Sequence, residues 1–195
     1  MMRFSATFSL FCVAIVSANQ KYFNQNNTNW KEATSIYDFH AKDIDGNDVS
    51  LEKYKGHVVI IVNVASKCGL AHTNYEQLQV LYNDYAESNG LRILAFPCNQ
   101  FNNQEPGTPE EIKEFIKKHG VTFDIFDKID VNGPEAHPLY QWLVNQKFES
   151  DFLSEPIEWN FVKFLINKEG KVVDRFGSKE EPFAMEYALQ HEFDQ

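Results

Sequence analysis

The sequence predicts an α/β fold in which helices flank a central mixed β-sheet on both faces and an N-terminal β-hairpin precedes it. Two observations support this prediction. Residues 58–65 form an almost unbroken apolar, β-branched run, which is typical of a strand buried on both faces. Strand and helix periodicities then alternate along the chain, and 195 residues suffice for one domain with a full core.

The predicted elements follow one another without an internal repeat. Asp45-Gly46 favours a tight hairpin turn, Gly90 ends the first long helix, and Thr108-Pro109 begins the second with a carboxylate at its third position. In chain order we expect a hairpin of 37–44 and 47–51, a strand over 58–65, a helix from Gly69 to Gly90, a strand over 91–96, a helix over 109–119, a short strand within 123–129, a helix over 138–146, a loop over 147–158, a hairpin of 163–167 and 171–176, and a helix over 182–191.

The first 18 residues have the pattern of a secretory signal peptide. Arg3 is their only charged residue, Phe8 to Val16 is a short apolar run, and Val16-Ser17-Ala18 provides small residues for cleavage. A membrane span would need roughly 20 apolar residues. We therefore expect a secreted protein with a signal peptide over 1–18, a flexible lead-in over 19–34 that has nothing to bury, and a single domain over 35–195. Asn26 is a candidate glycosylation site.

Composition limits the partners that this chain can have. It contains 18 Lys and Arg against 28 Asp and Glu, and the resulting formal charge of -10 disfavours nucleic acid and anionic membrane surfaces. The six histidines are scattered and no Cys-x-x-Cys pair exists, so we expect neither a metal site nor a resident cofactor.

Cys68 is the candidate nucleophile. It lies between the predicted buried strand and the following helix, where the free N–H groups of the helix and the adjacent Lys67 favour a thiolate. The alternative is a small buried thiol that packs like alanine. Ala71 stands where a dithiol redox protein needs its second cysteine, so a lone thiolate here fits peroxide reduction or nucleophilic hydrolysis.

Four separated motifs carry a resemblance to a known family. They resemble the glutathione peroxidase family, in its cysteine-containing, phospholipid-hydroperoxide-type branch and in a secreted form. The segments are Asn63 to Gly69 (NVASKCG), Leu94 to Phe101 (LAFPCNQF), Gln104 to Gly107 (QEPG) and Trp159 to Phe161 (WNF). The resemblance runs from about residue 35 to about residue 191. It implies a thioredoxin-like fold, reduction of hydroperoxides by an external thiol, and a catalytic tetrad of Cys68, Gln104, Trp159 and Asn160. Amide and indole N–H groups can stabilise a thiolate without titrating themselves.

One departure from the family concerns how the oxidised cysteine is reduced. Many cysteine-containing members carry a resolving cysteine in the helix after Glu-Pro-Gly, at a position that falls near Ile116 here, and this helix contains none. We expect Cys98, the other cysteine of the mature chain, to be structural. An external thiol such as glutathione is then the expected reductant.

Further departures concern substrate and assembly. Phospholipid-acting members tend to have lysines where this chain has Leu70 and Glu158, so we expect soluble hydroperoxides to be preferred over membrane lipids. The loop from Lys147 to Glu158 lacks the insertion that tetrameric members of the family use for association, so the resemblance implies a monomer. Asn102 replaces a glycine of the family, and we expect it to adopt the same positive φ.

Two other functions remain open at this stage. Oxidised Cys68 could form mixed disulfides with a partner, which would make the protein a redox sensor or binding protein with little turnover. An inert scaffold would require Cys68 to be unreactive. The sequence also leaves open whether Cys68 is native or replaces a selenocysteine.

Overall fold

The computed structural model describes residues 29–146 and 155–195, so the predicted signal peptide, Asn26 and most of the loop before Trp159 lie outside the described residues. A five-stranded mixed sheet forms the centre of the domain. In spatial order the strands are β5 (Asp124–Ile125), β4 (Arg92–Pro97), β3 (Val59–Val64), β6 (Lys163–Ile166) and β7 (Val172–Phe176). The central strand β3 pairs in parallel with β4 and antiparallel with β6.

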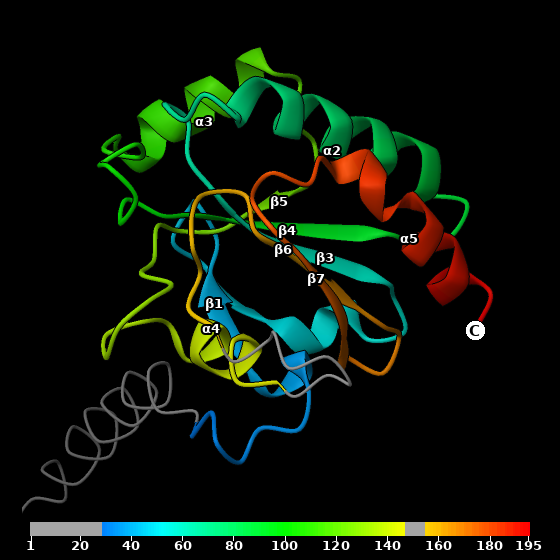
Figure 1. Cartoon of the computed structure of the whole chain (residues 1–195). Coiled ribbons are helices and arrows are strands. Elements are labelled where there is room, and N and C mark those ends of the chain that lie inside the picture. The colour runs from blue at the N-terminus through cyan, green and yellow to red at the C-terminus, as the bar shows by residue number, and fades with distance from the viewer. Residues whose placement is uncertain (1–28, 147–154) are drawn as a thin grey trace, which may run out of the picture.

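Helices cover both faces of this sheet, as predicted (Figure 1). On one face lie α2 (Ala71–Tyr85), α3 (Pro109–Lys118), the 3-10 turn η3 (Pro182–Met185) and α5 (Glu186–Phe193). On the other lie α4 (Pro138–Leu143), the hairpin of β1 (His40–Lys42) and β2 (Asp48–Ser50), and the 3-10 turns η1 (Ile36–Asp38) and η2 (Leu51–Tyr54). None of the helices in the described ranges has the length and apolar character needed to cross a membrane.

The central strand is apolar at every position except Asn63 because both of its faces are covered. Ile61 points into the core under α4, whereas Ile60 and Val62 point into the core under α2 and α5. All six residues of β3 are buried. The sequence of this strand therefore shows no alternation, as expected for a strand between two layers.

The predicted start of the second long helix is confirmed in detail. Thr108 Oγ1 accepts a hydrogen bond from Glu111 N at 3.3 Å, and Glu111 Oε2 accepts one from Thr108 N at 2.8 Å. Pro109 occupies the first helical position. This reciprocal capping box fixes where α3 begins.

Other predicted elements differ from the structure at their ends. The N-terminal hairpin keeps three residues in each strand, β5 has two residues, and the last predicted helix begins as the 3-10 turn η3. The end of the expected lead-in also contacts the domain, because Trp30 packs against the core and Trp142 Nε1 donates to Ala33 O at 3.1 Å. The indole ring of Trp30 gives this segment apolar area to bury, which the sequence prediction overlooked.

Candidate active site

Cys68 lies in the turn that joins β3 to α2, at the edge where the parallel strands β3 and β4 both end. Its amide donates to Ala65 O at 3.4 Å, and its carbonyl accepts from Ala71 N at 3.0 Å. The residue is 7% exposed and packs in the core under α2. The nucleophile candidate is therefore held in a fixed turn with a small exposed area, at the predicted edge of the sheet.

Gln104 and Asn160 lie far apart in the sequence and are in direct contact. Asn160 Nδ2 donates to Gln104 Oε1 at 2.8 Å. Asn160 is fully buried on the segment that enters β6, whereas Gln104 comes from the loop after β4. Because the oxygen of Gln104 accepts this bond, the amide N–H₂ of Gln104 is the group left to donate elsewhere.

Trp159 is the third predicted partner of Cys68 and precedes Asn160 directly. Its half-buried ring lies 5.8 Å from the ring of Phe101 and packs against both cores. Within the described residues, no hydrogen bond joins Cys68 Sγ to Gln104, Trp159 or Asn160. The structure thus pairs Gln104 with Asn160. A backbone hydrogen bond from Lys67 N to Gln104 O connects this pair to the turn that carries Cys68.

The turn that carries Gln104 has the predicted left-handed backbone. Asn102 and Asn103 both have φ of 51°, and Gln104 N donates to Phe101 O at 3.1 Å. Asparagine tolerates this region better than most residues. The replacement of glycine by Asn102 therefore preserves the turn.

Glu105 is a site residue to which the sequence analysis gave no role. It is fully buried, and its carboxylate accepts from Ser66 N at 2.8 Å and from Ser66 Oγ at 2.7 Å. Next to these bonds, Lys67 N donates to Gln104 O at 3.0 Å. Burial raises the pKa of the Glu105 carboxyl, although the Ser66 hydrogen bonds and the charges of Lys128 and Lys67 oppose the shift.

Asn63 is a second residue whose role the sequence did not indicate. It is fully buried in β3, where its Nδ2 donates to Trp159 O at 3.0 Å and its Oδ1 accepts from Val162 N at 3.1 Å. Its backbone carbonyl accepts from Phe161 N at 2.7 Å. Asn63 therefore attaches the Trp159-Asn160 turn to the strand that leads to Cys68.

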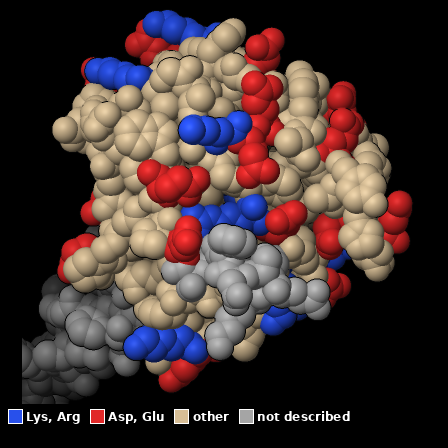
Figure 2. Space-filling model, in the orientation of Figure 1, with Lys and Arg blue, Asp and Glu red and all other residues tan. Residues whose placement is uncertain are grey.

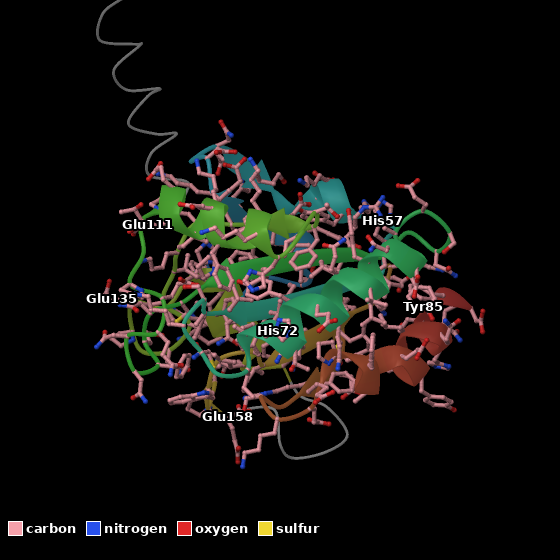
Figure 3. The ribbon with its side chains drawn as sticks, turned by 90° about the horizontal axis from the view of Figure 1, so that it is seen from above. His57, His72, Tyr85, Glu111, Glu135 and Glu158 are labelled. Carbon is pink, nitrogen blue, oxygen red and sulfur yellow. The ribbon has the colours of Figure 1, made fainter. Side chains whose placement is uncertain are left out.

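Charged residues hold the segment before Trp159 in place. Arg175 Nη2 contacts Glu158 Oε2 at 3.0 Å, and Glu158 Oε1 accepts from Ser178 N at 3.0 Å. On the neighbouring strand, burial lowers the pKa of Lys163 to about 8, and its ammonium donates to Glu180 O. Glu158 thus contributes a negative charge next to the Trp159-Asn160 turn. Figure 3 marks Glu158 together with His72 and Glu111, which lie in the first turns of α2 and α3.

Cys98 belongs to the opposite side of the sheet. It is fully buried in the core under α4, whereas Cys68 packs under α2. Both thiols are free, and burial raises the pKa of Cys98. The two thiols therefore pack on opposite faces of the sheet, which disfavours a direct disulfide between them.

Comparison with known proteins identifies the family of this chain. Residues 36–144 match the glutathione peroxidase family. A phospholipid hydroperoxide glutathione peroxidase of Pongo pygmaeus is 54% identical over 164 residues, which are 84% of this chain and 83% of that protein. The protein of the same name from Bos taurus is 54% identical over 160 residues, covering 82% of this chain and 81% of its own length.

Solved structures agree with this family and with the predicted thioredoxin-like fold. The crystal structure of T. cruzi GPX1 is 36% identical with a TM-score of 0.67, and covers 83% of this chain and 97% of its own. A thioredoxin-family thiol:disulfide interchange protein of Chlorobium tepidum is 15% identical with a TM-score of 0.59 over 80% of this chain and 92% of its own, and supports the fold alone. The chain therefore belongs to the glutathione peroxidase family, in the branch whose named members are phospholipid hydroperoxide glutathione peroxidases.

Proposed function

We propose that this protein is a thiol peroxidase that reduces hydrogen peroxide and organic or lipid hydroperoxides to water and alcohols, with Cys68 as the nucleophile. The Cys68 thiolate attacks one oxygen of ROOH, the O–O bond breaks, and RO⁻ takes a proton and leaves as ROH while the sulfur becomes a sulfenic acid. The observation that carries the proposal, in a chain of this family, is the hydrogen bond between Asn160 and Gln104. That bond orients the amide N–H₂ of Gln104, which with the Trp159 indole can stabilise the developing charge.

An external thiol such as glutathione is the proposed reductant. The first thiol converts the sulfenic acid into a mixed disulfide and releases water, and a second releases the disulfide of the reductant and restores Cys68. Two features of the chain support this route: Cys98 lies in the other core, and α3 contains no cysteine. The proposed cycle needs no metal or resident cofactor.

Steady-state hydroperoxide consumption tests this proposal against the redox-sensor alternative. A peroxidase consumes many equivalents of hydroperoxide per chain with glutathione, whereas a sensor consumes one equivalent and stops. Family membership favours the enzyme. A parallel assay with thioredoxin and its reductase identifies the reductant, because sustained turnover with thioredoxin and none with glutathione would contradict glutathione as the reductant.

We further propose that soluble hydroperoxides react faster than lipid hydroperoxides in anionic membranes. The relatives are named for phospholipid hydroperoxides, but Leu70 and Glu158 replace the two expected lysines here. Each lost lysine near an anionic surface costs about 1 kcal/mol, so two correspond to roughly a 30-fold weaker association. Basic side chains form only separate patches on the face in Figure 2.

Rates with cumene hydroperoxide and with oxidised vesicles that contain phosphatidylserine test this expectation. We expect the ratio of vesicle rate to cumene rate to rise about fivefold in Leu70→Lys, as one restored cation predicts. Equal rates on the two substrates in the unmodified protein would contradict it.

Sedimentation of the same protein tests the proposed monomer.

Secretion remains a proposal that rests on the N-terminal sequence. In a eukaryotic secretory host we expect the chain to lose residues 1–18 and to begin at Asn19 in the medium. The mass of the secreted protein, before and after removal of N-linked glycans, measures both the cleavage and the glycosylation at Asn26. An intact N-terminus retained inside the cell would contradict this proposal.

A further inference from the structure

Glu105 is a fully buried carboxylate beside the proposed nucleophile. Ser66 provides hydrogen bonds to both of its oxygens, from N at 2.8 Å and from Oγ at 2.7 Å. Lys128 Nζ lies nearby, and donates to the backbone carbonyls of Glu105 and Gly107 at 2.8 Å each. Among the residues that the structure describes, Ser66 is the one donor to this carboxylate, and it lies two residues before Cys68.

A buried carboxylate is costly, so its contacts indicate what it does. Leaving water penalises the charged form, and an apolar side chain of similar size would avoid that penalty. The two Ser66 hydrogen bonds, one from the backbone and one from the hydroxyl, offset it. These two hydrogen bonds therefore constrain mainly the turn over residues 65–68.

The same two segments are joined once more beside this contact. Lys67 N donates to Gln104 O at 3.0 Å, so residues 66–67 and 104–105 are connected by three hydrogen bonds. Gln104 in turn accepts from Asn160 at 2.8 Å. Glu105 and its neighbour Gln104 thus join the turn that carries Cys68 to the segment that carries the amide proposed to act on its sulfur.

We infer that Glu105 is a positioning residue for the peroxide reaction: its carboxylate fixes Ser66 and thereby sets the place of the Cys68 sulfur relative to the Gln104 amide. The inference rests on the proposed function. Glu105 does not touch the sulfur in this arrangement. It acts through the backbone of the 65–68 turn, and its loss misplaces the nucleophile.

Rapid mixing of the reduced protein with one equivalent of hydrogen peroxide, followed by tryptophan fluorescence and by thiol titration, tests the inference. The amplitude reports how many molecules are folded and competent, whereas the second-order rate constant reports how well the sulfur is placed. Glu105→Met removes both acceptors at similar size. We expect full amplitude and a rate constant about 100-fold lower, which is the effect of misplacing a reacting group by about 1 Å.

Two further variants separate positioning from a general effect on folding. In Glu105→Gln the amide oxygen can accept from Ser66 N while the amide N–H₂ donates to Ser66 Oγ, so the rate constant should return to within about fivefold of the unmodified protein. Ser66→Ala removes only the hydroxyl contact and should cost about tenfold. Ser66→Ala also keeps the test decisive if Glu105→Met does not fold.

Glu111→Met is the matched control. Glu111 also accepts a backbone N–H, from Thr108 at 2.8 Å, and it lines the same surface cavity of about 450 Å³ as Glu105, but its contact caps the N-terminal end of α3. We expect a lower melting temperature and an unchanged rate constant. An unchanged rate constant in both Glu105→Met and Ser66→Ala would overturn the inference, as would a loss confined to the amplitude. Absence of any reaction in the unmodified protein would instead overturn the proposed function, and the inference with it.

Discussion

Cys68→Ser is expected to lower the rate of peroxide reduction by roughly 10⁴-fold or more, the scale on which hydrolases lose activity when their nucleophile is removed. A serine hydroxyl stays protonated at neutral pH and is a weak nucleophile without a base, whereas a thiol is the most readily activated of the common nucleophiles. Serine is close to cysteine in size and fits the same nearly buried position, where residue 68 is 7% exposed, so the turn should keep its shape. Peroxide consumption under single-turnover conditions measures the loss.

Cys98→Ala is the control for this prediction. Cys98 lies in the core under α4, and its removal should cost about 1 kcal/mol of unfolding free energy through the small cavity left behind. The single-turnover rate constant should stay unchanged. Retained activity in Cys68→Ser would contradict the proposed nucleophile, and a loss of turnover in Cys98→Ala would assign Cys98 a role in reduction.

The fold could be predicted from the sequence where local signals act alone. The apolar run of β3 and the capping box at Thr108 are such signals, because each is complete within a few residues. Element ends were harder to predict. The strand β5 has two residues because it pairs only at Leu94 and Ala95 of β4, and no property of its own sequence sets that limit.

The site residues likewise divide into those that the sequence predicted and those that only the tertiary contacts revealed. Motif resemblance predicted Gln104 and Asn160, and the structure brings them within hydrogen-bond distance. Asn63 and Glu105 gained their roles only from tertiary contacts, with Trp159 and Val162 in one case and with Ser66 in the other. Asn63 did leave a signal, since it is the one polar residue in the apolar run over 58–65. A buried amide in a central strand needs partners, which by itself points to a specific contact.

Asn63→Leu is the second variant for which we expect a large effect, both on stability and on the reaction. The substitution leaves Trp159 O and Val162 N without their side-chain partners, 3.0 and 3.1 Å from the amide atoms they now contact. Each unpaired buried group costs about 1–3 kcal/mol, so the unfolding free energy should fall by about 4 kcal/mol. Urea unfolding measures this change.

The same variant should also slow the peroxide reaction by about 100-fold, because the turn that presents Trp159 and Asn160 loses its attachment to β3. This turn includes Phe161, a non-glycine residue with φ of 66°, and a left-handed backbone of this kind persists only where surrounding contacts hold it. Of the three hydrogen bonds between Asn63 and this segment, Asn63→Leu keeps the backbone bond from Phe161 N, and the bond from Asn160 to Gln104 also remains.

Asn167→Ala provides the comparison that separates the two effects. Asn167 Oδ1 also accepts from two backbone N–H groups, of Glu169 at 3.2 Å and of Lys171 at 2.9 Å, but these lie in the turn between β6 and β7. This variant should lose stability and keep its rate constant. If Asn63→Leu behaved in the same way, Asn63 would only stabilise the fold. A slower reaction in the molecules that remain folded would establish that Asn63 also fixes the position of Trp159 and Asn160 relative to Cys68, because its side chain joins their turn to β3.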